Sequence, residues 1–426
     1  MDYQETIQYL YDRLPVFHQI GAAAYKPGLE NSIRMMSELG NPQNSYKTIH
    51  VAGTNGKGSV SHFLAAILQS AGYQTGLYTS PHLVDFGERI RVNGAKVNRE
   101  YVVKFVEKYK PLFDRIEPSF FEATMAMAFD YFANENVDVA VIEVGLGGRL
   151  DSTNIIRPEL SVITNISFDH TQFLGDSLDK IAFEKAGIIK KETPVVIGES
   201  LAETKPVFIQ KAESENAPVF FAEELQPVRF LRYENGKMIV KTADFEMLEI
   251  GLNGIYQLKN VATVLEVVKQ LQKTGFNISE QHIRDGLSNV VSLTGLLGRW
   301  QTVSENPKII LDTAHNKGGF EYITEQLQQT KYNKLHFVFG MVNDKDISGV
   351  LSMLPKDAEY YFTAAETKRA LSPEELKNQA KTFGLHGNTY NTVYEAVKTA
   401  MMRAGADDLI YIGGSNFVVG EALELF

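Results

Sequence analysis

The sequence predicts an α/β protein with a doubly wound, mainly parallel sheet in a first domain and a smaller α/β domain after it. Short apolar runs rich in β-branched residues alternate with segments whose apolar residues recur at helical spacing. This alternation breaks once, near residues 219–250, and then resumes. With 426 residues, 44% hydrophobic and 22% charged, the chain is long enough for two or three domains with cores of their own.

The first sheet is expected to begin with a strand at Lys47–Ala52. A glycine-rich turn follows, and then a helix whose apolar residues from Val60 to Leu68 fall on one face. Further strands are expected at 76–79, 137–144, 160–166 and 193–197. The segment 119–134 is apolar on most faces and is therefore predicted to be a buried helix. Strands separated by helices predict a mainly parallel sheet.

The segment 219–250 contains short alternating runs around Glu234, Asn235 and Gly236, which predict a hairpin in a small antiparallel appendage. The later strands are expected at 308–311, 334–339, 359–363 and 408–412. They predict a second, Rossmann-like α/β domain. Because the stretch 292–298 has two glycines and no clear periodicity, we expect the linker there. The expected domains are therefore 1–293 and 299–426, with a hinge at 294–298.

Charge and composition exclude several classes of protein. Lys and Arg number 42 against 52 Asp and Glu, a net charge of −10, so no global basic field favours nucleic acid. No apolar run reaches the ~18–20 residues that span a bilayer, and the N-terminus lacks the order of a secretory signal. Without cysteine, a bound metal must take oxygen or imidazole ligands, which points to Mg²⁺. We expect a cytoplasmic enzyme without a membrane or nucleic-acid partner.

The turn between the first strand and the first helix predicts a phosphate-binding loop of P-loop type. Its residues are Gly53, Thr54, Asn55, Gly56, Lys57, Gly58 and Ser59. Glycines let successive N–H groups and the helix N-terminus face an anion, and the lysine adds a positive charge. The strict pattern is not met, because Val51 replaces the first glycine and Gly58 replaces the hydroxyl residue after Lys57. A metal ion bound with the nucleotide must therefore find its ligands elsewhere.

Polar side chains follow other predicted strands at their carboxyl ends, the edge where open α/β sheets bind ligands. Glu143 ends one strand, Asp169 and His170 follow the next along the chain, and Ser80 offers a hydroxyl group after the second strand. A carboxylate that caps its own loop, or a structural histidine, would give the same pattern. The convergence of these strand ends on one edge favours a ligand site. For Lys185, in contrast, the local sequence alone favours an ordinary helical lysine whose ammonium group is exposed.

A series of motifs runs in consistent order through nearly the whole chain. The motifs lie at 53–59, 79–83, 143–151, 169–175, 185–187, 253–257 with Asn260, 298–299, 312–316 and 413–415. Together they resemble the folylpolyglutamate synthase and dihydrofolate synthase family of the Mur-ligase superfamily. Agreement of one motif could arise by chance, whereas agreement of all of them in register could not.

The resemblance implies an ATP-dependent C–N ligase. In this family a substrate carboxylate attacks the γ-phosphate of ATP, which gives an acyl phosphate and ADP. The amino group of L-glutamate then attacks the acyl carbon, and phosphate leaves. Such chemistry needs positioning and charge neutralisation rather than a protein nucleophile. The implied acceptor is dihydropteroate, a folate or both; the sequence does not decide, and bifunctionality is our hypothesis. The family also implies a monomer.

The resemblance assigns roles to individual residues. The residues implied to bind ATP are the phosphate loop with Lys57, Asn260, Arg299 and Asp312. Ser80 and Glu143 would hold one Mg²⁺, and His170 would help to hold a second. Lys185 matches a lysine that the family carbamylates, and with Lys57, Glu143 and His170 it completes the implied catalytic set. Closure about the hinge should precede the chemistry and exclude water.

Three further residues match family positions for the other substrates. Asp151 matches an acidic residue of the pterin or acyl-substrate region, and His315 and, more weakly, Ser415 match residues that support nucleotide or glutamate binding. Arg89 and Arg91 are candidates for contacts near the acyl substrate, although an exposed basic loop would explain them as well.

The chain also departs from the family's usual pattern, in three places. Leu297 and Lys317 replace prolines, and Thr313 replaces a glycine. A β-branched residue would be strained if position 313 required a positive φ.

Other functions remain as alternatives. A cell-wall Mur ligase would be expected to carry a separate nucleotide-sugar domain, and only 46 residues precede the strand at Lys47. A non-catalytic nucleotide-binding relative would be expected to lose Lys57, Glu143 or His170, all of which are present. A nucleic-acid motor is disfavoured by the net charge of −10.

Overall fold

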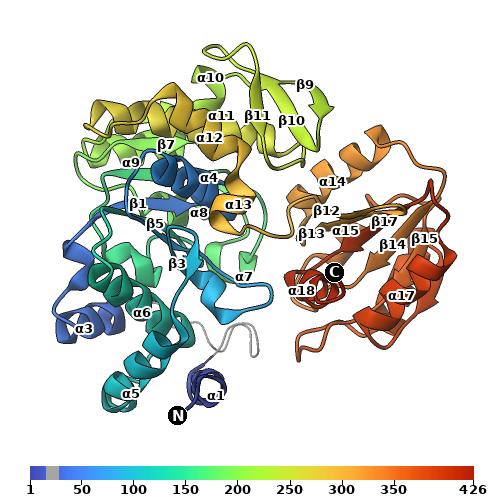
Figure 1. Cartoon of the computed structure of the whole chain (residues 1–426), viewed down its shortest axis with the longest axis horizontal. Helices are drawn as coiled ribbons and strands as arrows, with labels where there is room; N and C mark the ends of the chain where they lie inside the picture. The colour runs from blue at the N-terminus through green and yellow to red at the C-terminus, as the bar shows by residue number, and fades with distance from the viewer. Residues whose placement is uncertain (16–27) are drawn as a thin grey trace. The chain divides into compact units, whose positions relative to one another are not determined.

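The computed structural model describes residues 1–15 and 28–426, which fall into two compact units (Figure 1). The larger unit contains most of the chain up to Gly251 and then Gln257–Leu296. The smaller unit contains Leu252–Tyr256 and Leu297–Phe426. No signal in the sequence pointed to the short segment Leu252–Tyr256 as part of the smaller unit.

An eight-stranded sheet forms the centre of the larger unit, in the order β4-β3-β2-β5-β1-β6-β7-β8. Neighbours from β2 to β8 are parallel, and β3 and β4 add an antiparallel edge. The strands are β1 Lys47–Ala52, β2 Thr75–Tyr78, β3 Ile90–Val92, β4 Ala95–Lys96, β5 Val139–Glu143, β6 Leu160–Ile163, β7 Val195–Ile197 and β8 Val219–Phe221. The mainly parallel sheet is confirmed, although β6 and β7 are shorter than expected.

Helices cover both faces of this sheet (Figure 1). On one face α4 packs with α11, α12 and α13, and on the other α6 packs with α3 and α5. The helices of the larger unit are α1 Tyr3–Arg13, α3 Glu30–Glu38, η2 Pro42–Asn44, α4 Lys57–Ser70, η3 Phe86–Arg89, α5 Arg99–Ile116, α6 Phe120–Asn134, η4 Ser152–Ile155, α7 Thr171–Leu174, α8 Leu178–Ala186, α9 Lys205–Ser214, α10 Ala222–Leu225, α11 Gln257–Lys273, α12 Glu280–Ser288 and α13 Val290–Thr294.

The predicted buried helix is α6. It begins with a capping box, in which the Ser119 hydroxyl accepts from the Glu122 N–H and the Glu122 carboxylate accepts from the Ser119 N–H. Ala140 and Ile142, alternate residues of β5, join its hydrophobic cluster. The central strand β5 is therefore buried on both faces, as a strand in a parallel sheet must be.

The expected appendage is a three-stranded antiparallel sheet in the order β11-β10-β9, made of β9 Arg229–Glu234, β10 Lys237–Lys241 and β11 Leu248–Ile250. The hairpin turns at Asn235 and Gly236, both with positive φ, as a type I′ turn requires. The appendage is smaller than the segment 219–250 suggested, because β8 pairs in parallel with β7 in the main sheet. The expected departure from the sheet at residue 219 was wrong.

The smaller unit has a six-stranded sheet in the order β12-β13-β17-β14-β15-β16. Its elements are β12 Gln301–Glu305, β13 Lys308–Asp312, α14 Lys317–Gln329, β14 Leu335–Phe339, α15 Ile347–Leu351, β15 Glu359–Phe362, α16 Pro373–Thr382, β16 Gly387–Thr389, α17 Val393–Arg403, β17 Leu409–Gly413 and α18 Asn416–Leu423. The four predicted strands, β13, β14, β15 and β17, are present and parallel to one another, whereas β12 pairs with β13 in antiparallel orientation. The edge strands β12 and β16 were not predicted, because neither carries an apolar run.

The expected linker at 292–298 is partly helical. Helix α13 extends to Thr294, whose hydroxyl donates to the Val290 carbonyl at 2.6 Å and lies 2.8 Å from His62 Nδ1. Gly295 then ends the helix with a φ of 67°. Residues 292–294 are therefore part of the larger unit, and their assignment to an irregular linker was wrong.

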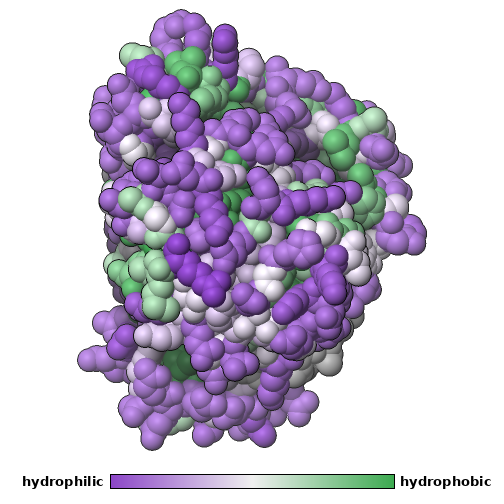
Figure 2. All heavy atoms as spheres, turned by 90° about the vertical axis from the view of Figure 1, so that its right-hand side faces the viewer, coloured by the Kyte–Doolittle hydropathy of each residue, from purple (hydrophilic) through white to green (hydrophobic). Residues whose placement is uncertain are grey.

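Within residues 1–15 and 28–426, no helix combines the length and the apolar composition needed to cross a bilayer. On the face shown in Figure 2, hydrophilic side chains predominate and hydrophobic ones occur in small separate groups.

Candidate active site

The phosphate loop joins β1 to α4, and two of its positions require glycine. Gly53 and Gly56 have φ values of 146° and 84°. A methyl group on Gly53 would lie 1.9 Å from Thr164 Oγ1, and one on Gly56 would lie 2.4 Å from Asn260 Oδ1. The loop therefore passes closer to its neighbours than any side chain allows. Helix α4 begins at Lys57, so the first N–H groups of the helix lie in the loop, as an anion site needs.

The residues that follow β6 support this loop. The Thr54 and Asn55 N–H groups donate to the carbonyl and the side-chain oxygen of Asn165, each at 2.9 Å. The Thr54 hydroxyl donates to the Ser167 carbonyl at 3.1 Å, and Asn55 Nδ2 donates to Ser167 Oγ. We did not predict Asn165 or Ser167, although their position just after a parallel strand was a usable signal.

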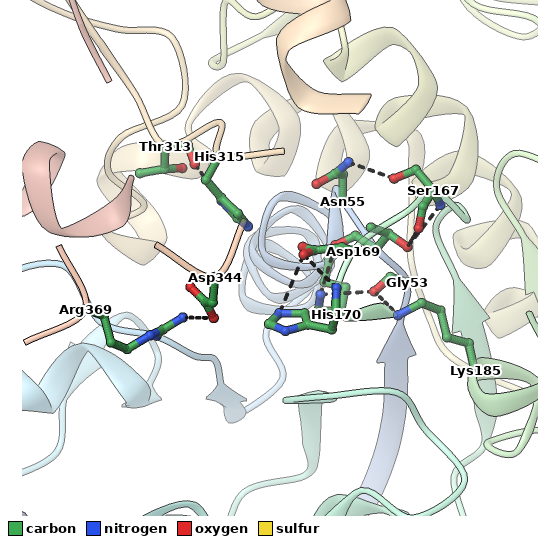
Figure 3. Close-up of polar contacts among 12 residues, drawn as sticks. Gly53, Asn55, Ser167, Asp169, His170, Lys185, Thr313, His315, Asp344 and Arg369 are labelled. Carbon is green, nitrogen blue, oxygen red and sulfur yellow. Dashed lines mark hydrogen bonds and ion pairs between the residues drawn. The ribbon is translucent and has the colours of Figure 1, made fainter. Parts of the chain in front are cut away.

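Two lysines converge on one carbonyl of the loop (Figure 3). Lys185 Nζ donates to the Gly53 carbonyl at 2.8 Å. Lys57 Nζ donates to the same oxygen at 3.0 Å. Lys185 is only 4% exposed, so the interpretation of it as an exposed helical lysine was wrong. Burial, and then the charge of Lys57, lower the pKa of Lys185 to about 7. Near neutral pH a large share of Lys185 is therefore the neutral amine.

Ser80 and Glu143 meet at the ends of the adjacent strands β2 and β5. The Ser80 N–H donates to Glu143 Oε2 at 3.2 Å, and Glu143 is 4% exposed. His170 follows β6, with its N–H donating to Asp169 Oδ1 at 2.9 Å and its Nε2 atom 3.9 Å from the same oxygen. The strand-end convergence expected from the sequence is present in the sheet order β2-β5-β1-β6.

These residues fit a nucleotide-bound Mg²⁺ better than a resident metal. Among the residues that the structure describes, no group of three or more His, Asp or Glu side chains could hold a metal ion by itself. Ser80 and Glu143 place a hydroxyl and a carboxylate at neighbouring strand ends. Mg²⁺ is typically bound by one or two carboxylates and takes its other ligands from phosphates and water, which is the donor set available here.

Helix α11 supports the phosphate loop from the other side. Gln257 Nε2 donates to Ser59 Oγ at 3.1 Å, and Asn260 Nδ2 donates to Gln257 Oε1 at 2.8 Å. The Asn260 side-chain oxygen also lies next to Gly56. The structure thus brings the predicted residue Asn260 to the loop, together with Gln257, which the sequence did not single out for a role.

Asp151 is buried in a loop of its own. Its carboxylate accepts from the Leu146 N–H at 2.8 Å and from the Thr153 N–H at 3.0 Å, and it caps η4. The pKa of Asp151 is raised, because the effect of burial exceeds that of the hydrogen bonds, which lower it. The visible role of Asp151 is to close the loop after β5, and its contact with the acyl substrate stays a prediction.

Among the predicted residues of the smaller unit, Asp312 is the last residue of β13. The Asp312 carboxylate accepts from the Tyr256 hydroxyl at 2.6 Å, the Trp300 N–H at 2.7 Å and the Ala314 N–H at 2.8 Å. Burial raises the pKa of Asp312. Tyr256 thus explains why the segment Leu252–Tyr256 belongs to this unit.

Thr313 is compatible with its position. It is not among the residues with positive φ, so the strain considered for a β-branched residue there is absent. Its hydroxyl donates to the Gly298 carbonyl at 3.1 Å and accepts from the Arg299 guanidinium. Arg299 also donates to the Gly298 carbonyl at 3.1 Å. The residue that departs from the family pattern therefore orients Arg299.

His315 and Ser415 have local partners. His315 Nδ1 lies 2.9 Å from the Thr313 carbonyl oxygen, and the Ser415 hydroxyl caps α18 by accepting from the Val418 N–H at 3.1 Å. Lys317 begins α14 behind Asn316, whose side chain caps that helix, so the usual proline is not needed to start it.

Arg89 and Arg91 are buried, at 1% and 6% exposure. The alternative of an exposed basic loop is therefore wrong.

Comparison with known proteins places this geometry in a family. Residues 51–268 match the Mur ligase middle domain, and residues 298–416 match the Mur ligase glutamate ligase domain. The Bacillus subtilis dihydrofolate synthase/folylpolyglutamate synthase is 32% identical over 437 residues, which cover 98% of this chain and 98% of that protein. This chain belongs to the folylpolyglutamate synthase and dihydrofolate synthase family of Mur ligases.

Other members agree in sequence and in structure. A probable bifunctional folylpolyglutamate synthase/dihydropteroate synthase of Haloferax volcanii is 33% identical over 99% of this chain, which spans 50% of that longer protein. Escherichia coli FolC, solved with DHPP and ADP, is 31% identical with a TM-score of 0.86, over 100% of this chain and 97% of that one. A bifunctional family member solved with Mn, AMPPNP and L-glutamate is 30% identical with a TM-score of 0.83, over 100% and 98% of the two chains.

Proposed function

We propose that this family member joins L-glutamate to the carboxylate of dihydropteroate and of reduced folates, at the expense of ATP. The observation that carries the proposal is the convergence of Lys57 and Lys185 on the glycine loop, with Ser80 and Glu143 at the neighbouring strand ends. The E. coli relative was solved with DHPP and ADP, and another with Mn, AMPPNP and L-glutamate, which supports these substrates here.

In the first step, an oxygen of the acceptor carboxylate attacks the γ-phosphorus of ATP. The bond from that phosphorus to the β,γ-bridging oxygen breaks, ADP leaves, and an acyl phosphate forms. The N–H groups of the phosphate loop and the Lys57 ammonium would hold the phosphates and neutralise the charge that develops on them. Asn260, Arg299 and Asp312 are the further residues we propose for ATP.

Ser80 and Glu143 would hold one divalent ion, and His170 would help to hold a second. An ion bound there supplies positive charge to the phosphate oxygens. Glu143 suits this role because it is nearly buried and lies at the carboxyl edge of the central strands, where the phosphate loop also begins.

Lys185 would act as a carbamate. A neutral amine is required, because its nitrogen attacks CO₂, an N–C bond forms, and one proton is lost to water. The lowered pKa of Lys185, about 7, supplies that neutral amine. The change replaces a cation beside Lys57 by an anion, which would attract a divalent ion where the ammonium repels it.

In the second step, the amino nitrogen of L-glutamate attacks the acyl carbon. The bond from that carbon to the phosphate oxygen breaks, phosphate leaves, and the nitrogen loses one proton as the amide forms. His315 and Ser415 are the residues we propose for glutamate or nucleotide, and Asp151 for the acyl substrate. A cytoplasmic monomer is the form we expect for this enzyme.

The test is ADP release in the presence of Mg²⁺ and L-glutamate, with dihydropteroate in one series and a reduced folate monoglutamate in the other. Turnover with both acceptors supports the bifunctional ligase, and turnover with only one rejects bifunctionality. No turnover with either, in folded protein that binds ATP, would overturn the proposed substrates. Lys57→Ala serves as the inactive reference, since this lysine contributes little packing.

A further inference from the structure

Arg89 is a buried arginine that the proposed chemistry does not use. It lies at the end of η3, just before β3, and is 1% exposed. Its Nε atom donates to His82 Nδ1 at 2.7 Å, and its guanidinium lies 5.1 Å from the centre of the Phe120 ring. Burial of a permanent cation costs several kcal/mol unless polar contacts offset it.

The contacts of Arg89 continue through His82 to Tyr11. An arginine Nε–H can only donate, so His82 Nδ1 must accept, and the hydrogen of a neutral His82 lies on Nε2. That nitrogen is 3.2 Å from the Tyr11 hydroxyl oxygen. The Tyr11 ring in turn stacks on Phe120, with 5.1 Å between centroids. Arg89, His82, Tyr11 and Phe120 thus form a closed ring of contacts.

This ring holds the segment that carries Ser80. The Arg89 carbonyl accepts from the Thr79 N–H at 3.0 Å, on one side of Ser80. The Arg89 side chain holds His82, on the other side of it. Ser80 is therefore fixed between two anchors that belong to the same residue, with its own N–H on Glu143.

Glu143 is the second group that Arg89 affects. The negative charge of Glu143 is among those that act on Arg89, and the attraction is mutual. Glu143 is also held to the same segment directly, because the Ser80 N–H donates to its Oε2 atom at 3.2 Å.

We propose that Arg89 is a positioning residue for the divalent ion, because it holds Ser80 and Glu143 in the arrangement that binds it. This inference rests on the proposed function of those two residues. Arg89 is buried and acts through its contacts with the Thr79–His82 segment rather than as a ligand of the ion.

The loop between His82 and Arg89 has its own support, so substitution of Arg89 leaves this loop folded. The Glu88 carboxylate accepts from the N–H groups of Leu83, Val84 and Asp85 at 2.8, 3.2 and 2.9 Å. Asp85 caps η3 by accepting from the Gly87 N–H. Loss of Arg89 should therefore loosen the end of the loop at Ser80 rather than unfold it.

Arg91 provides a matched control. It is also a buried arginine, two residues along the chain, but it donates to the Gly94 carbonyl at 2.9 Å and lies against Gly295. Its contacts lead away from Ser80 and Glu143. Arg91→Met therefore reports the cost of losing a buried arginine as such.

The experiment measures Mn²⁺ binding by electron paramagnetic resonance, in full-length protein with AMPPNP, for the wild type, Arg89→Met, Arg89→Lys, His82→Ala and Arg91→Met. We expect Arg89→Met to bind Mn²⁺ roughly 10- to 100-fold more weakly, the range typical of residues that orient metal ligands. Arg89→Lys should recover part of this loss of Mn²⁺ affinity. His82→Ala should also bind Mn²⁺ more weakly, whereas Arg91→Met should bind it as tightly as the wild type does. Melting temperatures measured alongside show whether each variant is folded.

Wild-type affinity in Arg89→Met would overturn the inference and leave the proposed metal ligands standing. An equal loss in Arg91→Met would also overturn it, because the effect would then be one of stability. If Arg89→Met does not fold, the Mn²⁺ affinity of His82→Ala tests the inference instead, because His82 is only half-buried and its substitution should not unfold the protein. Wild-type affinity in His82→Ala would then overturn the inference. Absence of Mn²⁺ binding in the wild type would overturn the proposed ligands and this inference together.

Discussion

The shared contact of Lys57 and Lys185 with one carbonyl makes a quantitative prediction. Substitution of Lys57 by Met removes a positive charge close to Lys185 and keeps a side chain of similar length. The charge of Lys57 is one of the two causes that lower the pKa of Lys185, and burial is the larger. The pKa of Lys185 should therefore rise in Lys57→Met.

The size of the rise follows from the geometry. Both ammonium nitrogens lie within 3.0 Å of the Gly53 carbonyl oxygen. They are thus at most about 6 Å apart, where an effective dielectric constant of about 20 gives a repulsion of roughly 3 kcal/mol, or ~2 pKa units. Because burial accounts for more of the shift than this charge does, we expect a rise of about 1 unit.

The assay is heteronuclear NMR of protein labelled with ¹³C at the lysine ε-carbon, titrated in buffer free of CO₂ so that no carbamate forms. Lys185→Arg assigns the signal. Lys190, whose pKa is lowered by burial and by Lys211, serves as a reference within the same protein. Lys180→Met removes an exposed charge of the same helix and should leave the pKa of Lys185 unchanged. An unchanged or lower pKa of Lys185 in Lys57→Met, with Lys190 constant, would refute the reasoning.

Three further predictions concern single substitutions. Lys185→Ala should be inactive and partly rescued by acetate, which replaces the carbamate; lack of rescue, together with an unmodified lysine mass in the wild type, would contradict carbamylation. Gly53→Ala should lower the free energy of unfolding in urea by about 2 kcal/mol or more, because its methyl group meets Thr164 at 1.9 Å. Gly72→Ala is its control, since φ is also positive there (86°) but no atom lies within 4 Å, so an equal loss in both would exclude the clash. The Tyr256 hydroxyl donates a hydrogen bond that lowers the pKa of Asp312, which burial raises. Tyr256→Phe removes this bond and should lower the free energy of unfolding by about 1.5 kcal/mol at pH 7.5, measured by unfolding followed through the fluorescence of the single tryptophan, Trp300. Tyr256→Phe should raise the pKa of Asp312 further. A group with a raised pKa stabilises the fold at low pH and loses this contribution as the pH rises, so the loss of unfolding free energy in Tyr256→Phe should be smaller near pH 4 than at pH 7.5. A loss that does not depend on pH would argue against Asp312 as its cause.

Much of the fold could be predicted because the signals are local. The alternation of β-rich runs with helical stripes located β1, α4, α6 and most of the parallel strands of both units, since each depends only on residues close in sequence. In the smaller unit, the strands that escaped prediction, β12 and β16, are short, lie at sheet edges and bury little. They are strands because they pair with β13 and β15, and no local sequence pattern predicts that pairing.

The residues of the candidate site likewise fall into those that local sequence patterns predict and those that they do not. The glycine loop was readable because a tight turn between a strand and a helix requires particular residues at particular positions. Lys185 was not readable as a buried residue, because 132 residues separate it from the carbonyl that it contacts. The burial of Arg89 and Arg91 was likewise hidden, since it depends on Phe120 and on Gly295, which lie far along the chain.

The sequence by itself determined the fold class, the phosphate loop and the family, because each rests on residue types at fixed spacing. Only the tertiary structure decided that Lys57 and Lys185 share one carbonyl, that Ser80 meets Glu143, and that Arg89 contacts the Thr79–His82 segment on both sides of Ser80. These contacts set charge, burial and pKa. Such properties depend on distances between strand ends and loops that become neighbours only when the sheet forms.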